Sequence, residues 1–166
     1  MKKRILVLLL ALAMVSGVTA CGSGSALTEV GNYKVTVPAE YVQMSSATTD
    51  TSSGYKTNDG DMLTIMILPK VSALITTDDM IQATIDGLSA QGFDLEYDED
   101  VNIDGKSIGI RMTGQWTADD GNAFPTDVYA SQMVDTGEIL ICAFSYASGS
   151  PDEEMENAVL ESISSK

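Results

Sequence analysis

The sequence has 166 residues, and its 24 aspartates and glutamates against 9 lysines and arginines give a net charge of −15. So acidic a chain repels nucleic acid and anionic lipid headgroups, and we therefore exclude nucleic acid as a partner. The sequence contains no histidine, which excludes Ser-His-Asp triads, Cys-His pairs and histidine-ligated zinc sites. Catalysis by carboxylates stays open, because so many acids always include some pair at a workable spacing.

The first twenty residues have the order of a secretory signal peptide. Lys2, Lys3 and Arg4 precede an apolar run from Ile5 to Val15, and small residues follow it. A run of eleven apolar residues is too short to span a membrane, which takes about twenty. We therefore predict that residues 1–20 are removed.

The predicted cleavage site resembles a bacterial lipobox, with Val18-Thr19-Ala20 directly before Cys21. In such signals the cysteine sulfur receives a diacylglycerol, and cleavage between Ala20 and Cys21 then makes the cysteine the new N-terminus. The resemblance implies a lipoprotein held on the outer, extracytoplasmic face of a cell membrane by acyl chains of the palmitate type. Residues 21–29 are predicted to be the lipidated N-terminus and a flexible tether, and residues 30–166 a single domain.

The first predicted helix begins at Thr76. Thr76 can cap the helix, and Asp79 stands at the position from which a carboxylate reaches back in a capping box. Apolar residues recur at helical spacing from Met80 to Leu88, and Gly92 is the predicted C-cap.

A second helix is predicted at the end of the chain. Ser150 is its expected cap, Pro151 its first residue and Glu153 its acidic third residue. Met155 and Val159 lie on one stripe, and the helix is expected to continue to the last few residues.

The rest of the sequence predicts strands and turns. Alternating or continuous apolar residues predict strands over 33–37, 62–68, 93–103, 106–116, 124–134 and 138–146. The Ser/Thr-rich stretch Ser45 to Gly54 predicts a loop. The last strand is apolar on both faces, which is typical of a central strand with layers above and below it. The predicted fold class is α+β, an antiparallel sheet covered by two helices.

This order of elements resembles the PsbP-like fold. An opening strand ends in Val35-Thr36-Val37-Pro38, a hairpin and a capped helix follow, and a Gly turn at Val101-Asn102-Ile103-Asp104-Gly105-Lys106 joins the next two strands. The fold is an α/β/α sandwich shared by the photosystem II protein PsbP, a yeast Ran-binding protein and LpqN-type lipoproteins. The resemblance implies a binding or accessory module rather than an enzyme, and no functional residue can be transferred by position.

One segment matches the opening of a calcium-binding loop. Asp100, Asn102 and Asp104 alternate before Gly105, as oxygen ligands do in an EF-hand. The twelfth position should be glutamate and is Arg111. The alternative is a plain hairpin with these polar side chains facing outward.

Aromatic residues supply the other candidates for recognition. Trp116 could anchor a partner, but it shares a predicted face with Ile108, Ile110 and Met112, which favours the core. Four tyrosines are candidates for lining a pocket between sheet and loop: Tyr41, Tyr55, Tyr129 and Tyr146. Cys142 lies in an apolar run and is predicted to be a buried, inert thiol.

Three functions follow as hypotheses. The first is a non-catalytic, lipid-anchored module that binds another envelope protein or a small ligand, with no cofactor. The second is a calcium-binding envelope protein that uses the acidic segment Asp94 to Asp104. The third is a hydrolase that works through a pair of carboxylates.

Overall fold

The main sheet of this computed structural model is antiparallel throughout. The structure describes residues 25–68, 76–102 and 107–166. Within them the sheet has seven strands in the order β3-β4-β5-β9-β8-β7-β6. Their bounds are Val42–Thr49 (β3), Ser52–Lys56 (β4), Met62–Leu68 (β5), Ile139–Ser145 (β9), Ala123–Met133 (β8), Ser107–Thr117 (β7) and Phe93–Val101 (β6).

Strand β9 lies in the middle of this sheet, between β5 and β8. Every one of its residues is buried. Leu140, Cys142 and Phe144 join one hydrophobic cluster, whereas Ile139 and Ile141 join the other. The prediction of a central strand with layers on both sides is confirmed.

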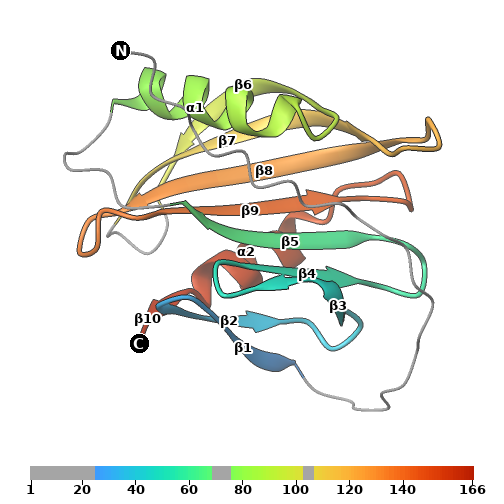
Figure 1. The fold of residues 1–166 in the computed structure, drawn as a ribbon, viewed down its shortest axis with the longest axis horizontal. Coiled ribbons are helices and arrows are strands. Elements are labelled where there is room, and N and C mark those ends of the chain that lie inside the picture. Colours follow the sequence, from blue (N-terminus) through green and yellow to red (C-terminus); the bar gives the residue numbers. More distant parts are fainter. Residues whose placement is uncertain (1–24, 69–75, 103–106) are drawn as a thin grey trace.

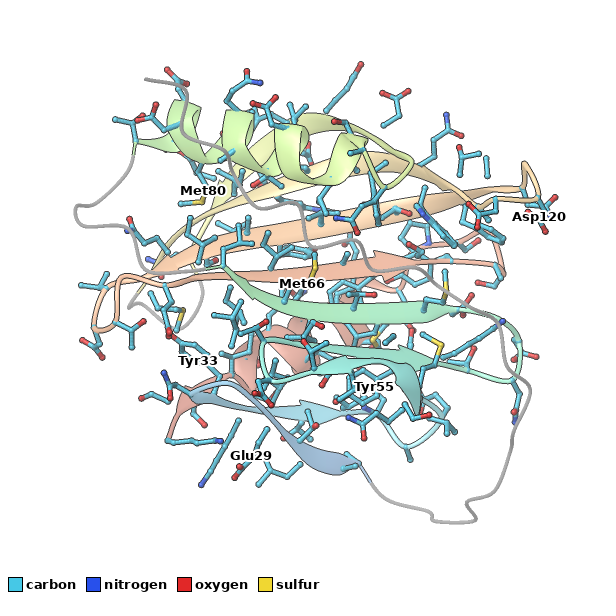
Figure 2. All side chains as sticks on the ribbon, in the orientation of Figure 1. Glu29, Tyr33, Tyr55, Met66, Met80 and Asp120 are labelled. Carbon is cyan, nitrogen blue, oxygen red and sulfur yellow. The ribbon has the colours of Figure 1, made fainter. Side chains whose placement is uncertain are left out.

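Helix α1, Thr77–Ser89, covers one face of the sheet over β6 and β7 (Figure 1). It begins as predicted, because the Asp79 amide donates to the Thr76 hydroxyl at 3.2 Å. Met80 points from the helix toward the sheet (Figure 2) and, with Leu88, is buried against the β7, β8 and β9 side chains of that face. The helix ends slightly before the predicted glycine, with Ala90 as its C-cap.

The opposite face is covered by helix α2, Glu153–Glu161, and by a small sheet in the order β1-β2-β10. The small sheet consists of Ala26–Val30 (β1), Tyr33–Val37 (β2) and Ser164–Ser165 (β10). Their buried side chains form one cluster with β5 and β9. Tyr55 of β4 connects the two sheets by donating a hydrogen bond of 2.6 Å to Thr28 of β1. The chain therefore has the predicted α+β architecture, with a layer on each side of the main sheet.

Three boundaries differ from the predictions. Residues 26–29 belong to β1 and not to the tether, so the folded domain begins before residue 30. Only Val30 of that edge strand is buried, which leaves almost no alternating pattern to detect. Helix α2 is capped by Asp152 rather than Ser150, since the Asp152 carboxylate accepts from the Met155 amide at 3.0 Å, and the helix ends at Glu161.

The third difference is the stretch from Ser45 to Gly54, which forms most of the β3–β4 hairpin instead of a loop. Ser52, Ser53 and Gly54 are buried although they are small and polar. A Cβ atom on Gly54 would lie only 2.7 Å from that of Ala47. Small residues, which are typical of a loop, are needed here because the two strands pack closely against each other.

Candidate functional site

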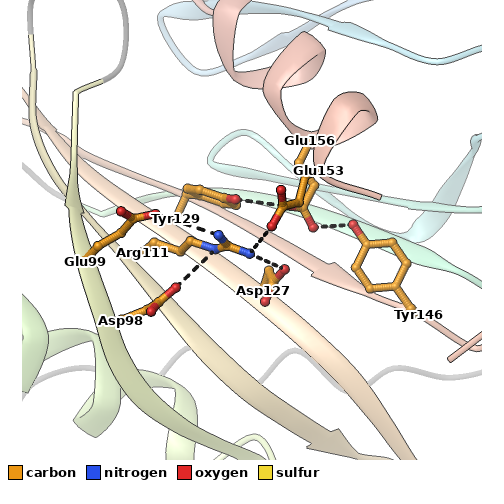
Figure 3. A network of polar contacts seen from close by, with 8 residues as sticks. All are labelled: Asp98, Glu99, Arg111, Asp127, Tyr129, Tyr146, Glu153 and Glu156. Carbon is orange, nitrogen blue, oxygen red and sulfur yellow. Dashed lines mark hydrogen bonds and ion pairs between the residues drawn. The ribbon is translucent and has the colours of Figure 1, made fainter. Parts of the chain in front are cut away.

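A network of polar side chains lies between the main sheet and α2 (Figure 3). Its centre is Arg111 of β7, which pairs across the sheet with Tyr129 of β8; the guanidinium lies 5.8 Å from the centre of the tyrosine ring. Arg111 forms a hydrogen-bonded ion pair of 3.1 Å with the buried Asp127 and one of 3.4 Å with Glu153 of α2. Asp98 and Glu99 approach it from β6, both at 3.7 Å. One cation is thus shared by four carboxylates.

Glu156 of α2 is the second buried acid of this network, with no exposed surface. Its two carboxylate oxygens accept hydrogen bonds from the hydroxyls of Tyr129, at 2.7 Å, and Tyr146. Burial raises the pKa of the Glu156 carboxyl to about 7, although the two hydroxyls oppose the shift. A sealed carboxyl with both oxygens occupied has no access to a substrate, so the network is suited to holding α2 on the sheet rather than to chemistry.

Beside this network the surface has a hollow of about 280 Å³. Four of the residues that line it are acids: Glu40, Asp59, Asp61 and Asp152. The remaining wall consists of Tyr41, Thr57, Asn58, Tyr146, Ser148, Ser150 and Met155. The hollow contains no basic side chain, and it adjoins the network through Tyr146, whose hydroxyl bonds Glu156.

Tyr41 is the unusual residue of the hollow. Its side chain is only 7 % exposed, yet its hydroxyl has no hydrogen-bond partner among the described residues. Among the described side chains, two atoms are sealed from solvent and lack a hydrogen-bond partner, Arg111 Nε and Ser131 Oγ. The Tyr41 oxygen is not one of them. The Tyr41 hydroxyl therefore reaches solvent, and the hollow that it lines is the opening. Burial, together with the charges of Asp61 and Glu40, raises the pKa of Tyr41 well above its ordinary value.

The four candidate tyrosines have separate roles. Tyr41 and Tyr146 line the hollow, Tyr129 belongs to the buried network, and Tyr55 bonds β1. Arg111 stood out in the sequence only as a mismatch to the calcium-loop pattern, whereas in the structure it contacts Glu153 of α2 and the buried Asp127. Asp59 and Asp61 flank Gly60 in the turn before β5, and no local signal indicates that they line one hollow with Asp152.

The predicted calcium ligands are only partly within the described residues. Asp100 lies in β6 and Asn102 directly after it, both exposed, while Asp104 lies outside the described ranges. In the part of the chain that the structure describes, no group of three or more acids or cysteines is arranged to hold a metal ion. Calcium binding therefore stays a prediction, without support from the geometry.

Trp116 is half-buried on the α1 side of the sheet. It stacks on Phe124, with ring centres 5.5 Å apart, and lies 6.3 Å from Phe93. Its indole nitrogen donates to the Gln91 carbonyl oxygen at 3.1 Å. The polar end of the ring is thus used within the protein, and a recognition role for Trp116 is a prediction that this packing does not favour.

The lipidation site lies outside the described residues, since Ala20 and Cys21 belong to residues 1–24. The anchor on Cys21 therefore stays a prediction. Among the residues that the structure does describe, no helix is both long and apolar enough to cross a membrane.

Comparison with solved structures identifies the fold. The chain is similar to the Ran-binding protein Mog1p of Saccharomyces cerevisiae, with a TM-score of 0.58 and 9 % identity, over 87 % of this chain and 96 % of that one. A point mutant of Mog1 gives a TM-score of 0.57 and 10 % identity, over 86 % and 96 %. A protein of Bacteroides thetaiotaomicron gives 0.58 and 12 % identity, over 87 % of this chain and 49 % of that chain, so the present chain spans about half of it.

These likenesses establish the fold alone, because sequence identity is so low. They confirm the predicted architecture and its relation to the yeast Ran-binding protein. No protein-family model and no curated protein matches the sequence.

Proposed function

We propose that this protein is a lipoprotein, anchored by Cys21 to the outer face of a bacterial membrane, whose folded domain binds another envelope protein or a small ligand without catalysing a reaction. The anchor rests on the signal-like N-terminus and the lipobox resemblance. The observation that supports binding is the hollow beside α2, where Tyr41 presents an unpartnered hydroxyl among four carboxylates. Glu156 and Arg111 are the groups that could do chemistry. Both are instead engaged inside the protein, since Glu156 accepts from Tyr129 and Arg111 donates to Asp127.

The relation to a fold that includes a Ran-binding protein supports the same proposal by analogy. A fold that serves as a binding module elsewhere needs no active site here. The strongly acidic surface would also keep a tethered domain away from anionic headgroups, so that it stays accessible to a partner.

The anchor is tested with the full chain expressed in a bacterial host that is fed a clickable palmitate analogue. The wild-type chain should carry the label and sediment with membranes, whereas Cys21→Ala should lose the label and keep the uncleaved signal. Cys142→Ala is the matched control, because that buried thiol is the other cysteine of the chain. Equal labelling of Cys21→Ala and the wild type would refute lipidation at this residue.

Binding is tested by crosslinking the tagged full chain in intact cells and identifying the proteins recovered from the membrane fraction. A specific partner should be recovered with the wild type and reduced when the hollow is altered by Glu40→Gln with Asp59→Asn. Recovery that is unchanged in this variant would place the interaction elsewhere on the domain. Failure to recover any specific protein, together with no small-molecule binding, would contradict the proposal.

A further inference from the structure

We propose that the hollow beside α2 binds a polyatomic cationic group, an alkylammonium or a guanidinium, presented by a small molecule or by a basic side chain of a partner. This inference deepens the proposed binding function and rests on it. It is carried by the charge, the hydrogen-bonding capacity and the size of the hollow.

The charge of the hollow is uncompensated. Within the described residues, none of its four acids forms an ion pair. Within the described residues, the acids that do form ion pairs do so with Arg111, which Asp127 and Glu153 share, or with Lys166, which Glu29 holds at 2.7 Å. The hollow is therefore a place where negative charge converges without a cation of the protein's own, and a cationic ligand would be attracted to it.

The hydrogen-bonding capacity of the hollow matches a ligand that only donates. Ammonium and guanidinium groups are donors without acceptor atoms, and carboxylates are acceptors without donors. The Tyr41 oxygen lines the hollow and can accept a bond from such a donor. Met155 offers an apolar contact for methylene groups next to the charge. Two of the acids retain structural roles, since Asp61 accepts from the Ser148 amide and Asp152 caps α2, which leaves Glu40 and Asp59 free to orient toward a ligand.

The size of the hollow limits the ligand to a small group. Its volume of about 280 Å³ lies just below the roughly 300–1,000 Å³ of pockets for drug-sized molecules. A bare metal ion fits less well, because the described acids do not form a group arranged to hold one. One basic side chain, or an amine of similar length, matches both the volume and the chemistry.

The test is a ligand-observed NMR titration of the full chain, purified in an uncharged detergent, at fixed ionic strength. The charged probes are Nα-acetyl-arginine amide and n-butylammonium, and the neutral probe is Nα-acetyl-citrulline amide, which has nearly the shape of the first. Saturable binding of at least one charged probe, and none of the neutral one, is expected. Equal binding of the charged and neutral arginine analogues, or no binding of any probe, would overturn the inference.

Variants show whether binding occurs in the hollow. Glu40→Gln with Asp59→Asn should weaken binding by about tenfold, since two exposed charge pairs with the ligand are lost. Tyr41→Phe should weaken it by about threefold without lowering the melting temperature, because the hydroxyl makes no bond within the protein. The matched control is Asp94→Asn with Glu96→Gln on β6, which removes the same charge at the far edge of the sheet. Equal weakening by the control would mean attraction by the whole acidic surface and would overturn the site.

The two probes also distinguish the source of the cation. Binding of Nα-acetyl-arginine amide, whose backbone is blocked as in a protein, supports a partner's side chain; binding of n-butylammonium alone supports a small amine. The membrane crosslinking experiment is independent of both, because it detects a partner of any chemistry. A partner recovered there, combined with no probe binding in the hollow, would refute the cationic ligand and leave the binding function in place.

Discussion

Replacing Glu156 with glutamine should remove a specific pH dependence of stability. Burial, opposed by the two tyrosine hydroxyls, raises the pKa of this carboxyl from 4.5 to about 7 in the folded protein. Between these two values the folded state holds a proton that the unfolded chain has released. The free energy of unfolding should therefore fall as the pH rises from about 4.5 to about 7 and should level off above that, because the native state binds more protons in this window.

The magnitude follows from the same two pKa values. A shift from 4.5 to about 7 corresponds to at most about 3 kcal/mol, since each pKa unit is worth about 1.4 kcal/mol. Solvent in the hollow beside Tyr146 screens part of this, so that about 1–2 kcal/mol is the expected loss. The substituted glutamine would keep the volume, and its amide can still accept from one tyrosine and donate to the other if a hydroxyl rotates. The Glu156→Gln variant should thus match the wild type at pH 5 and exceed its stability by about 1–2 kcal/mol at pH 8.

The assay is urea unfolding of both proteins at several pH values from 5 to 8, followed by the fluorescence of Trp116. The difference between the two curves isolates Glu156 from the general repulsion among the other acids. Glu154→Gln is the matched control, since this exposed neighbour on α2 carries the same charge and should leave the pH dependence unchanged. A Glu156→Gln protein with the same pH dependence as the wild type would refute the reasoning.

Three further substitutions test the packing. Gly114→Ala should cost about 2–3 kcal/mol in urea unfolding, because its Cβ would collide with the Asp94 carbonyl oxygen; Gly87→Ala, in open space on α1, should instead stabilise by about 0.5–1 kcal/mol. Asp152→Ala removes the α2 cap and should cost about 1 kcal/mol. Burial raises the pKa of the Cys142 thiol to about 12, so iodoacetamide at pH 8 should label Cys142 only after unfolding, as mass spectrometry would show. A loss of stability in Gly87→Ala would contradict the open space around that residue. Unchanged stability in Gly114→Ala or Asp152→Ala would contradict the close contact or the helix cap, and labelling of the native protein would contradict the burial of the Cys142 thiol.

The elements that sequence analysis predicted are those in which a local pattern and the tertiary environment agree. Strand β9 is buried at every position because layers cover both of its faces, and α1 begins where the Thr76 hydroxyl caps the helix and donates to the Asp79 carboxylate. Strand β1 was missed because it is an edge with a single buried residue, and β4 because its small residues serve close packing. In both cases the structure depends on pairing with a neighbouring strand. That strand lies outside any short stretch of sequence from which a local pattern is judged.

The candidate site was less accessible to prediction for the same reason. The hollow combines residues from three separate stretches of the chain, 40–41, 57–61 and 146–155. Within each stretch these residues also have local turn or cap chemistry, since the Asp61 amide donates to the Thr57 hydroxyl and Asp152 caps α2. Their meeting depends on the order of strands in the sheet, which the sequence pattern does not specify. Sequence analysis could name Tyr41 and Tyr146 as pocket candidates because aromatic residues often line pockets, but it could not separate them from Tyr55 and Tyr129.

The distribution of cations shows why the acidic hollow differs from the rest of an acidic protein. The excess of acids over bases means that most carboxylates must remain unpaired wherever the chain folds. Arg111 stands where carboxylates are withdrawn from water, next to the buried Asp127, because an unpaired buried charge is the most costly kind. Glu40 and Asp59 remain unpaired where solvent still reaches them, and they line the same hollow as Tyr41, whose hydroxyl also lacks a partner among the described residues. Net charge alone could not distinguish these two situations, and only the second leaves a place for a cation from outside.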